Sequence, residues 1–203
     1  MAKGVLARLD GAVDDFCRRT RYFREEMTKG RARMFAMQHR LNTRQRNSVL
    51  KLKVATNCPD WDTRIGLSRK DIQGAKPIAS TQLAWSAWEG LMANRHWLEG
   101  IVANTCAERA NVPGYGTGTM KKHGWFGLER ERWGKLFGLS GDELEFFELH
   151  EKADIVHSNA GWRAVERFAK RLHMQDAVVA ACEKNLQVWE MYLNGIGEAG
   201  GRL

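Results

Sequence analysis

Residues 140–171 read SGDELEFFELHEKADIVHSNAGWRAVERFAKR, and this stretch decides the fold. Ser140 followed three residues later by Glu143 is a capping-box pattern, and the strong helix formers after it predict a long helix. Within that helix, the positions i, i+4 and i+7 are His150, Asp154 and His157. At about 100° per residue, their side chains fall in a stripe roughly 60° wide and about 10 Å long. The helix therefore presents two imidazoles and one carboxylate on one face.

The same stripe continues through apolar residues, so we expect it to face the core: Phe147, Ile155, Ala164 and Phe168. Neutral imidazoles and a carboxylate that converge on one face are what a transition-metal ion requires. Burying these groups without a partner is costly, and a bound metal removes that cost. The spacing alone leaves a second interpretation open, because an i, i+4 His–Asp pair is also an ordinary contact on a helix surface.

Length and composition predict one all-α domain over residues 1–203. The chain has three prolines, few alternating runs and many segments with a 3.6-residue period. No stretch approaches the length of a membrane span, and Asp10 and Asp14 come too early for a signal peptide. The four cysteines form no CxxC pair, which is typical of reduced thiols. We therefore expect a cytoplasmic protein with no membrane partner.

The net charge of +8 comes from both signs mixed along most helices, which favours a small anionic ligand or a mild affinity for nucleic acid and does not require nucleic acid. A second helix is expected over residues 31–55, and its centre at 42–48 contains no apolar residue. That centre either faces solvent or lines a polar cavity. In the cavity interpretation, a substrate carboxylate is held by Gln38, Arg44 or Arg46, since the guanidinium fork suits that geometry. Trp85 and Tyr115 are further candidates for substrate contact.

The motif HxxxDxxH is accompanied by two other features, the run Leu144-Glu145-Phe146-Phe147 before it and a carboxylate on an earlier helix. That carboxylate, Glu108, stands just before a Pro/Gly loop in the run Ala107-Glu108-Arg109-Ala110-Asn111-Val112-Pro113. Together these residues resemble the haem-oxygenase-like diiron oxidases and oxygenases. The resemblance extends from about residue 23 to residue 197, and its specific part is the HxxxDxxH helix with Glu108.

The resemblance implies an all-α, haem-oxygenase-like (TenA-like) helical bundle with non-haem iron. It implies Fe(II), as two ions, with O2 as co-substrate and a small amino-acid-derived or other anionic substrate in natural-product biosynthesis. The implied metal ligands are Glu108, His150, Asp154 and His157. The same ligands serve oxygen insertion, desaturation, C–C cleavage and N-oxygenation, so the reaction type stays open.

One departure from the family pattern lies at the junction of Arg64 and Ile65. The family has a further helix with a Glu and a His ligand there, and the sequence passes directly to the stretch that normally follows it. Either the protein has lost this helix, which leaves full coordination for one iron, or residues are missing from the sequence at this point, which we favour. Glu89 and His96, seven residues apart, are a weaker substitute pair.

Two other functions are alternatives. Thiaminase-like and quinone-cofactor-synthesis proteins use the same bundle without metal, and a cysteine nucleophile would then be Cys106, two residues before Glu108. The basic segment from Arg31 to Lys53 could instead bind nucleic acid, although no recognition-helix pattern accompanies it. A homodimer is also left open.

Overall fold

Helix α10 (Gln175–Gly200) runs through the middle of the molecule. In the computed structural model, which describes residues 4–50, 64–92 and 95–203 (for 43–50 and 92 the backbone alone), α10 contacts five other helices. These are α1 (Val5–Arg19), α2 (Arg21–Arg24), α3 (Lys29–Leu50), α6 (Ala79–Met92) and α7 (Trp97–Arg109). The side of α10 that they cover is apolar and buried: Val178, Cys182, Leu186, Trp189, Leu193 and Ile196.

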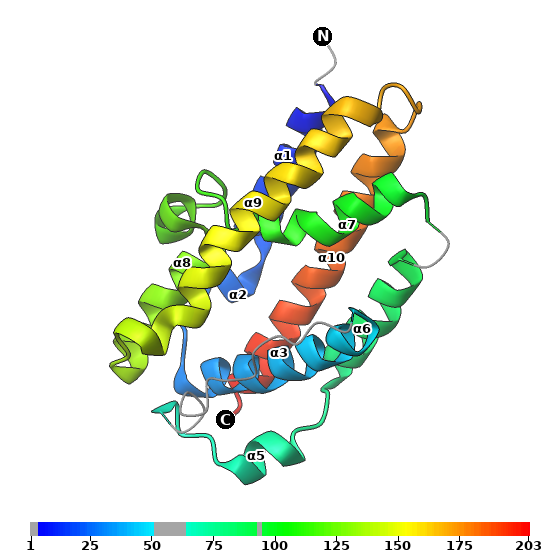
Figure 1. Ribbon diagram of the computed structural model, residues 1–203. Coiled ribbons are helices and arrows are strands. Elements are labelled where there is room, and N and C mark those ends of the chain that lie inside the picture. Colours follow the sequence, from blue (N-terminus) through cyan, green and yellow to red (C-terminus); the bar gives the residue numbers. More distant parts are fainter. Residues whose placement is uncertain (1–3, 51–63, 93–94) are drawn as a thin grey trace.

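A second layer is formed by α9 (Glu145–Phe168), which crosses α7 and also contacts α1 and α8 (Gly118–Phe137). Figure 1 shows α9 and α10 as the two long rods, with α7 passing between them. Helix α5 (Arg69–Gly74) is short and joins α3 to α6 across one end. Over the described ranges, all regular secondary structure is helical and forms one body, which confirms the all-α prediction.

The helix start predicted at Ser140 is present in the structure, with one difference in its first turn. The backbone N–H of Ser140 donates to Glu143 Oε2 at 3.1 Å, so the capping box is present. It opens a 3₁₀ turn, η1 (Gly141–Leu144), and α9 continues from Glu145. The aromatic-rich run at 120–138 predicts two short helical pieces before this helix, and the structure has them in α8. The α8 segment contains one residue with non-helical dihedrals, Gly124, with φ 75° and ψ −177°.

Two helix boundaries were predicted wrongly. The apolar side formed by residues 4–28 predicts a single helix, but the chain is divided at Thr20, whose extended ψ of 113° separates α1 from α2. The glycines at the end of the chain predict that the C-terminal helix ends at Gly195 before a mobile tail, but α10 continues to Gly200. A Cβ at residue 200 would lie 2.5 Å from Arg31 Cα, so the terminal glycines allow α10 and α3 to touch.

The two residues at the Arg64–Ile65 junction contact α3 and the 3₁₀ turn before α9. Ile65 is buried, and its carbonyl accepts a hydrogen bond from Arg33 Nε at 2.7 Å. Arg64 Nε lies 2.6 Å from Glu143 Oε1. Residues 51–63, which precede the junction, lie outside the described part, so the missing ligand helix remains a prediction.

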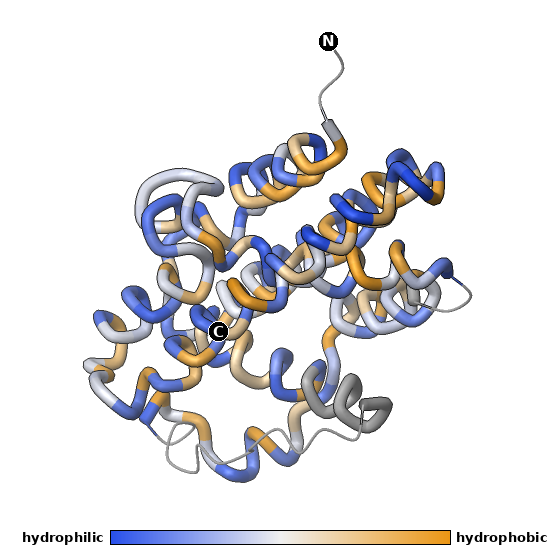
Figure 2. Tube along the Cα trace, turned by 45° about the horizontal axis from the view of Figure 1, so that its top comes forward, coloured by the Kyte–Doolittle hydropathy of each residue, from blue (hydrophilic) through white to orange (hydrophobic). Residues whose placement is uncertain are grey.

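Figure 2 shows hydrophilic and hydrophobic residues alternating along the helices, as expected when each helix buries one side. The core between them is rich in aromatic rings, including the buried Trp133, Phe35 and Phe147. None of the helices in the described part is both long and apolar enough to span a lipid bilayer.

Candidate metal centre

Three of the four predicted ligands meet in the structure. Glu108 lies in the last turn of α7, and Asp154 and His157 lie on α9. One ligand atom from each of the three lies within 4.8 Å of the others. His157 Nδ1 is 3.8 Å from Glu108 Oε2. Two helices therefore direct two carboxylates and one imidazole to one point.

A close crossing of α7 and α9 makes this meeting possible. Gly161 lies one turn after His157, and a Cβ built on it would stand 2.3 Å from Thr105 Oγ1. Thr105 precedes Glu108 by three residues, which is nearly one turn of α7. The absence of a side chain at Gly161 thus lets the helices approach at the level of the three ligands.

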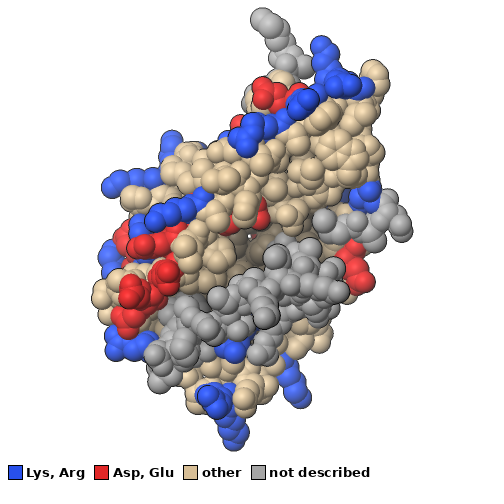
Figure 3. All heavy atoms as spheres, in the orientation of Figure 1, with Lys and Arg blue, Asp and Glu red and all other residues tan. Residues whose placement is uncertain are grey.

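The three side chains differ in exposure. Asp154 is 7% exposed, the Glu108 side chain is 24% exposed, and the His157 side chain is 60% exposed. Figure 3 shows acidic atoms at the edge of a hollow near the centre of this face, within a mostly uncharged surface. The group is therefore anchored in the protein at Asp154 and open at His157. An open side is what a catalytic metal needs for its co-substrate.

The buried end of the group has a partner that sequence reasoning did not identify. Asn111 Nδ2 donates to Asp154 Oδ2 at 2.7 Å, and both residues are buried. Asn111 stands in the run that contains Glu108, but a single asparagine before a Pro/Gly loop has no spacing that would single it out. Only the packing of α7 against α9 brings it to Asp154.

His150 lies one turn before Asp154 and outside the group of three. Its Nδ1 is 2.7 Å from the carbonyl oxygen of Phe146, and its ring packs against the rings of Phe126 and Phe146. Because a carbonyl only accepts, Nδ1 carries the hydrogen and the lone pair is on Nε2, the tautomer found in metal-binding histidines. Burial, with a smaller effect from His157, lowers the pKa of His150 and favours neutral imidazole. Its role as a ligand stays a prediction.

Two of the candidate substrate residues connect α3 to its neighbours. The Gln38 side chain donates to the Lys76 carbonyl at 3.0 Å and accepts from the Ile78 N–H at 3.1 Å. Trp85 Nε1 donates to Asn42 Oδ1 at 3.2 Å. These contacts stabilise the packing of α3 on α6 and its preceding segment. The side chains of Arg44 and Arg46 lie outside the described part.

Tyr115 belongs to a network behind the ligand-bearing turn. Its hydroxyl donates to Asp10 Oδ1 at 2.6 Å and accepts from Arg109 Nε at 2.9 Å. Burial and the Asp10 hydrogen bond raise the pKa of Tyr115, so the hydroxyl stays protonated. Trp162 Nε1 also donates to Asp10 Oδ1, at 2.8 Å. The network joins α1, α7 and α9 directly beside Glu108.

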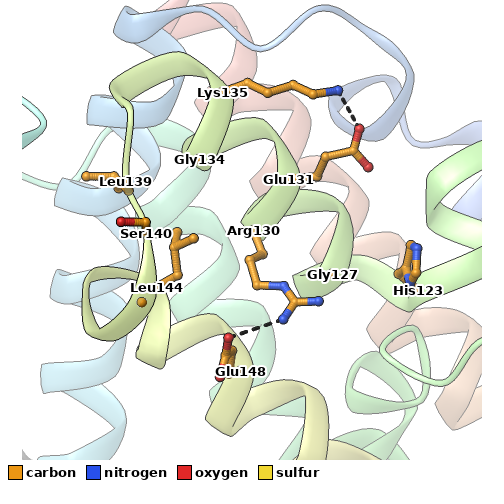
Figure 4. Close-up of a pocket in the computed structure, with 11 residues that line it drawn as sticks. His123, Gly127, Arg130, Glu131, Gly134, Lys135, Leu139, Ser140, Leu144 and Glu148 are labelled. Carbon is orange, nitrogen blue, oxygen red and sulfur yellow. Dashed lines mark hydrogen bonds and ion pairs between the residues drawn. The ribbon is translucent and has the colours of Figure 1, made fainter.

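A depression of about 550 Å³ between α8 and the start of α9 is not part of this centre (Figure 4). Its lining contains none of the four predicted ligands. Two ion pairs neutralise the charges drawn there, Arg130 with Glu148 at 3.3 Å and Lys135 with Glu131 at 2.6 Å. The substitute pair is also placed elsewhere: Glu89 is exposed, and His96 Nδ1 accepts from the Leu98 N–H as the N-cap of α7.

Comparison with known proteins yields a partial similarity. No family model matches the chain. Over 65 residues, the chain is 38% identical to a protein of Nitrosomonas europaea named 4-aminobenzoate synthase. The match covers 32% of this chain and 26% of that protein, so the chain spans about a quarter of the length of this relative.

Proposed function

We propose that the protein is a non-haem iron oxidase or oxygenase with a haem-oxygenase-like fold, which binds Fe(II) and uses O2 to oxidise a small anionic metabolite. The observation that supports this is the convergence of Glu108, Asp154 and His157 from two helices. Their ligand atoms lie within 4.8 Å of one another, although 46 residues separate Glu108 from Asp154 in the chain.

The chemistry of the ligand set fits Fe(II). Imidazole with carboxylates, leaving open positions, is typical of non-haem iron oxygenases. Two carboxylates and a neutral imidazole also balance the charge of a divalent ion, which limits the cost of holding the metal in a partly buried place. Bound iron would supply the activation of O2, and the chain would supply the ligands and the apolar wall that Phe126 and Phe146 form beside His150.

The same residues bear on how many metal ions the centre would hold. Among the described residues, one group of three or more ligands has this geometry. The two ions implied by the family resemblance would need ligands beyond that group. Metal stoichiometry therefore distinguishes a one-iron from a two-iron centre.

The name of the partial relative suggests a class of small molecule to test. That protein is named for the synthesis of 4-aminobenzoate, a small aromatic amine with a carboxylate. A positively charged protein, with formal net charge +8, attracts an anion of this kind. We propose a small carboxylate of this class as substrate or product, and 4-aminobenzoate is the first product to assay.

The test is anaerobic reconstitution with Fe(II), followed by metal analysis, O2 uptake and mass spectrometry for 4-aminobenzoate. We expect the wild type to retain iron and to consume O2. His157→Ala and Asp154→Ala should each lose iron, with activity reduced by about 100-fold or more, because each removes a ligand. His123→Ala removes an exposed histidine outside the centre and is the matched control. A wild type that retains no iron, or a His157→Ala/Asp154→Ala double variant that retains it fully, would contradict the proposal.

The metal-free alternative with a cysteine nucleophile receives no support from the structure. Cys106 is 0% exposed, and Asn185 Nδ2 donates to its sulfur at 3.0 Å between α7 and α10. A nucleophile must reach its substrate, and this thiol is enclosed.

A further inference from the structure

The buried carboxylate of the centre accepts a hydrogen bond from a buried amide. Asp154 is 7% exposed, and Asn111 is 1% exposed. Asn111 Nδ2 donates to Asp154 Oδ2 at 2.7 Å, a short hydrogen bond to a charged acceptor. A carboxylate in such a place turns about its χ2 axis unless a neighbour fixes it. The amide of Asn111 provides that constraint.

The Asn111 side chain is itself fixed from a second direction. Its Oδ1 accepts a hydrogen bond from the Phe126 backbone N–H at 2.7 Å. Both ends of the amide are therefore used, and the orientation of the amide group is determined, since only NH2 donates and only oxygen accepts. The amide connects the backbone of α8 to the metal-binding carboxylate of α9.

The backbone of Asn111, like its side chain, is fixed by hydrogen bonds and close packing. Its N–H donates to the Glu108 carbonyl at 3.0 Å, within the turn that ends α7. The neighbouring Ala110 carbonyl accepts from the Trp125 N–H at 2.9 Å. Gly124 packs directly on this segment, because a Cβ there would stand 2.2 Å from the Asn111 carbonyl oxygen. The segment cannot shift without moving α8.

We infer that Asn111 is a positioning residue of the metal centre, which fixes the orientation of the Asp154 carboxylate towards the ion. This inference rests on the proposed function, because it assigns Asn111 a role only if the centre binds metal. The inference predicts that removing the Asn111 amide lowers metal affinity as well as folding stability. Partners that orient a metal ligand change metal affinity about 10–100-fold when they are removed.

The experiment compares Asn111→Leu with a matched control, Asn185→Leu. Asn185 is also a buried asparagine, 3% exposed, and its amide donates to Cys106 Sγ and to the Ala103 carbonyl, not to a metal ligand. Fe(II) affinity is measured anaerobically against a competing chelator, and the visible spectrum of the Co(II)-loaded protein reports the ligand geometry. Thermal unfolding of the metal-free proteins measures the structural effect of each change separately.

We expect Asn111→Leu to bind Fe(II) about 10–100-fold more weakly and to change the Co(II) spectrum. Asn185→Leu should unfold at a lower temperature but keep the affinity within about 3-fold. An Asn111→Leu protein that keeps wild-type affinity overturns the inference, as does an equal loss in Asn185→Leu. If Asn111→Leu does not fold, Asn111→Ser is measured in its place, with the same two outcomes. A wild type that binds neither ion refutes the proposed function itself, a result distinct from the failure of Asn111 alone.

Discussion

Glu129 is a fully buried carboxylate away from the centre. Trp133 Nε1 donates to it at 3.0 Å, and the Tyr22 hydroxyl lies 3.4 Å from it. Arg132 is 3.4 Å from the other carboxylate oxygen. Burial raises the pKa of Glu129, although Arg132 and the hydrogen bonds act in the opposite direction. The folded protein therefore binds this proton more tightly than the unfolded chain does.

The sign of the pH dependence follows from that raised pKa. The contribution of Glu129 to stability is fully present below its unfolded pKa of about 4.5 and is lost as the pH rises through the folded pKa. We expect the unfolding free energy of wild type minus that of Glu129→Gln to fall as the pH rises from about 4.5 through the raised pKa. The glutamine still accepts from Trp133 but does not titrate.

Urea denaturation of both proteins across this range measures the difference. Glu131→Gln, on the same helix but exposed, is the control, because the hydrogen bond and the charge of Lys135 keep the pKa of Glu131 below its ordinary value. Its difference from wild type should stay constant above pH 5. A constant difference for Glu129→Gln as well would contradict the prediction.

At the scale of the elements, the break inside α8 determines how α8 packs against the turn that follows α7. Gly124 has φ 75°, a region that glycine adopts readily, and it places Trp125 so that its N–H reaches the Ala110 carbonyl. The two halves of α8 therefore form a bent element whose backbone hydrogen-bonds to Ala110 and Asn111, directly after α7. This bend also brings the Phe126 N–H to Asn111.

Gly124→Ala should be severely destabilising. The new methyl group would collide with the Asn111 carbonyl and would also require positive φ, so we expect a loss of about 3 kcal/mol or more. Gly11→Ala is the control, because nothing lies within 4 Å of a Cβ at this helical position of α1. It should gain about 0.5–1 kcal/mol from helix propensity. Urea denaturation measures both, and a Gly124→Ala protein as stable as wild type would show that the α8–α7 contact is adaptable.

At the scale of the whole molecule, the C-terminal end of α10 closes the bundle against the start of α3. A Cβ on Gly30 would stand 2.3 Å from the Gly200 carbonyl oxygen, and a Cβ on Gly200 would stand 2.7 Å from the Gly30 carbonyl oxygen. The two backbones are in direct contact, although 170 residues separate them (200 minus 30). Figure 1 shows the C-terminus beside the start of α3.

Gly200→Ala should separate these helices. We expect a loss of about 2–3 kcal/mol from overpacking and a fall in Tm of roughly 5–10 °C, as usual for a chain of this size. Gly90→Ala in α6 is the control, because a Cβ there meets nothing within 4 Å. Thermal unfolding of both variants measures the effect. An unchanged Tm for Gly200→Ala would mean that the last turn of α10 does not contribute to the fold.

Several features of this protein follow from the sequence alone. Ser140 and Glu143 mark a helix start, and the spacing of Asp154 and His157 puts them on one face. Each of these depends on residues at most seven apart, and helical geometry relates such residues directly. The resemblance added Glu108, and the structure places it with Asp154 and His157.

Other features were decided only by the tertiary structure. The hydrogen bond from Asn111 to Asp154, the contact of Gly30 with Gly200 and the exposure of His157 all depend on where two helices cross. Crossing points are set by the fit of side chains from distant segments, and small residues such as Gly161 decide how close the backbones come. A helical period predicts which side of a helix is buried, but it contains no information about which neighbour covers that side or at which turn.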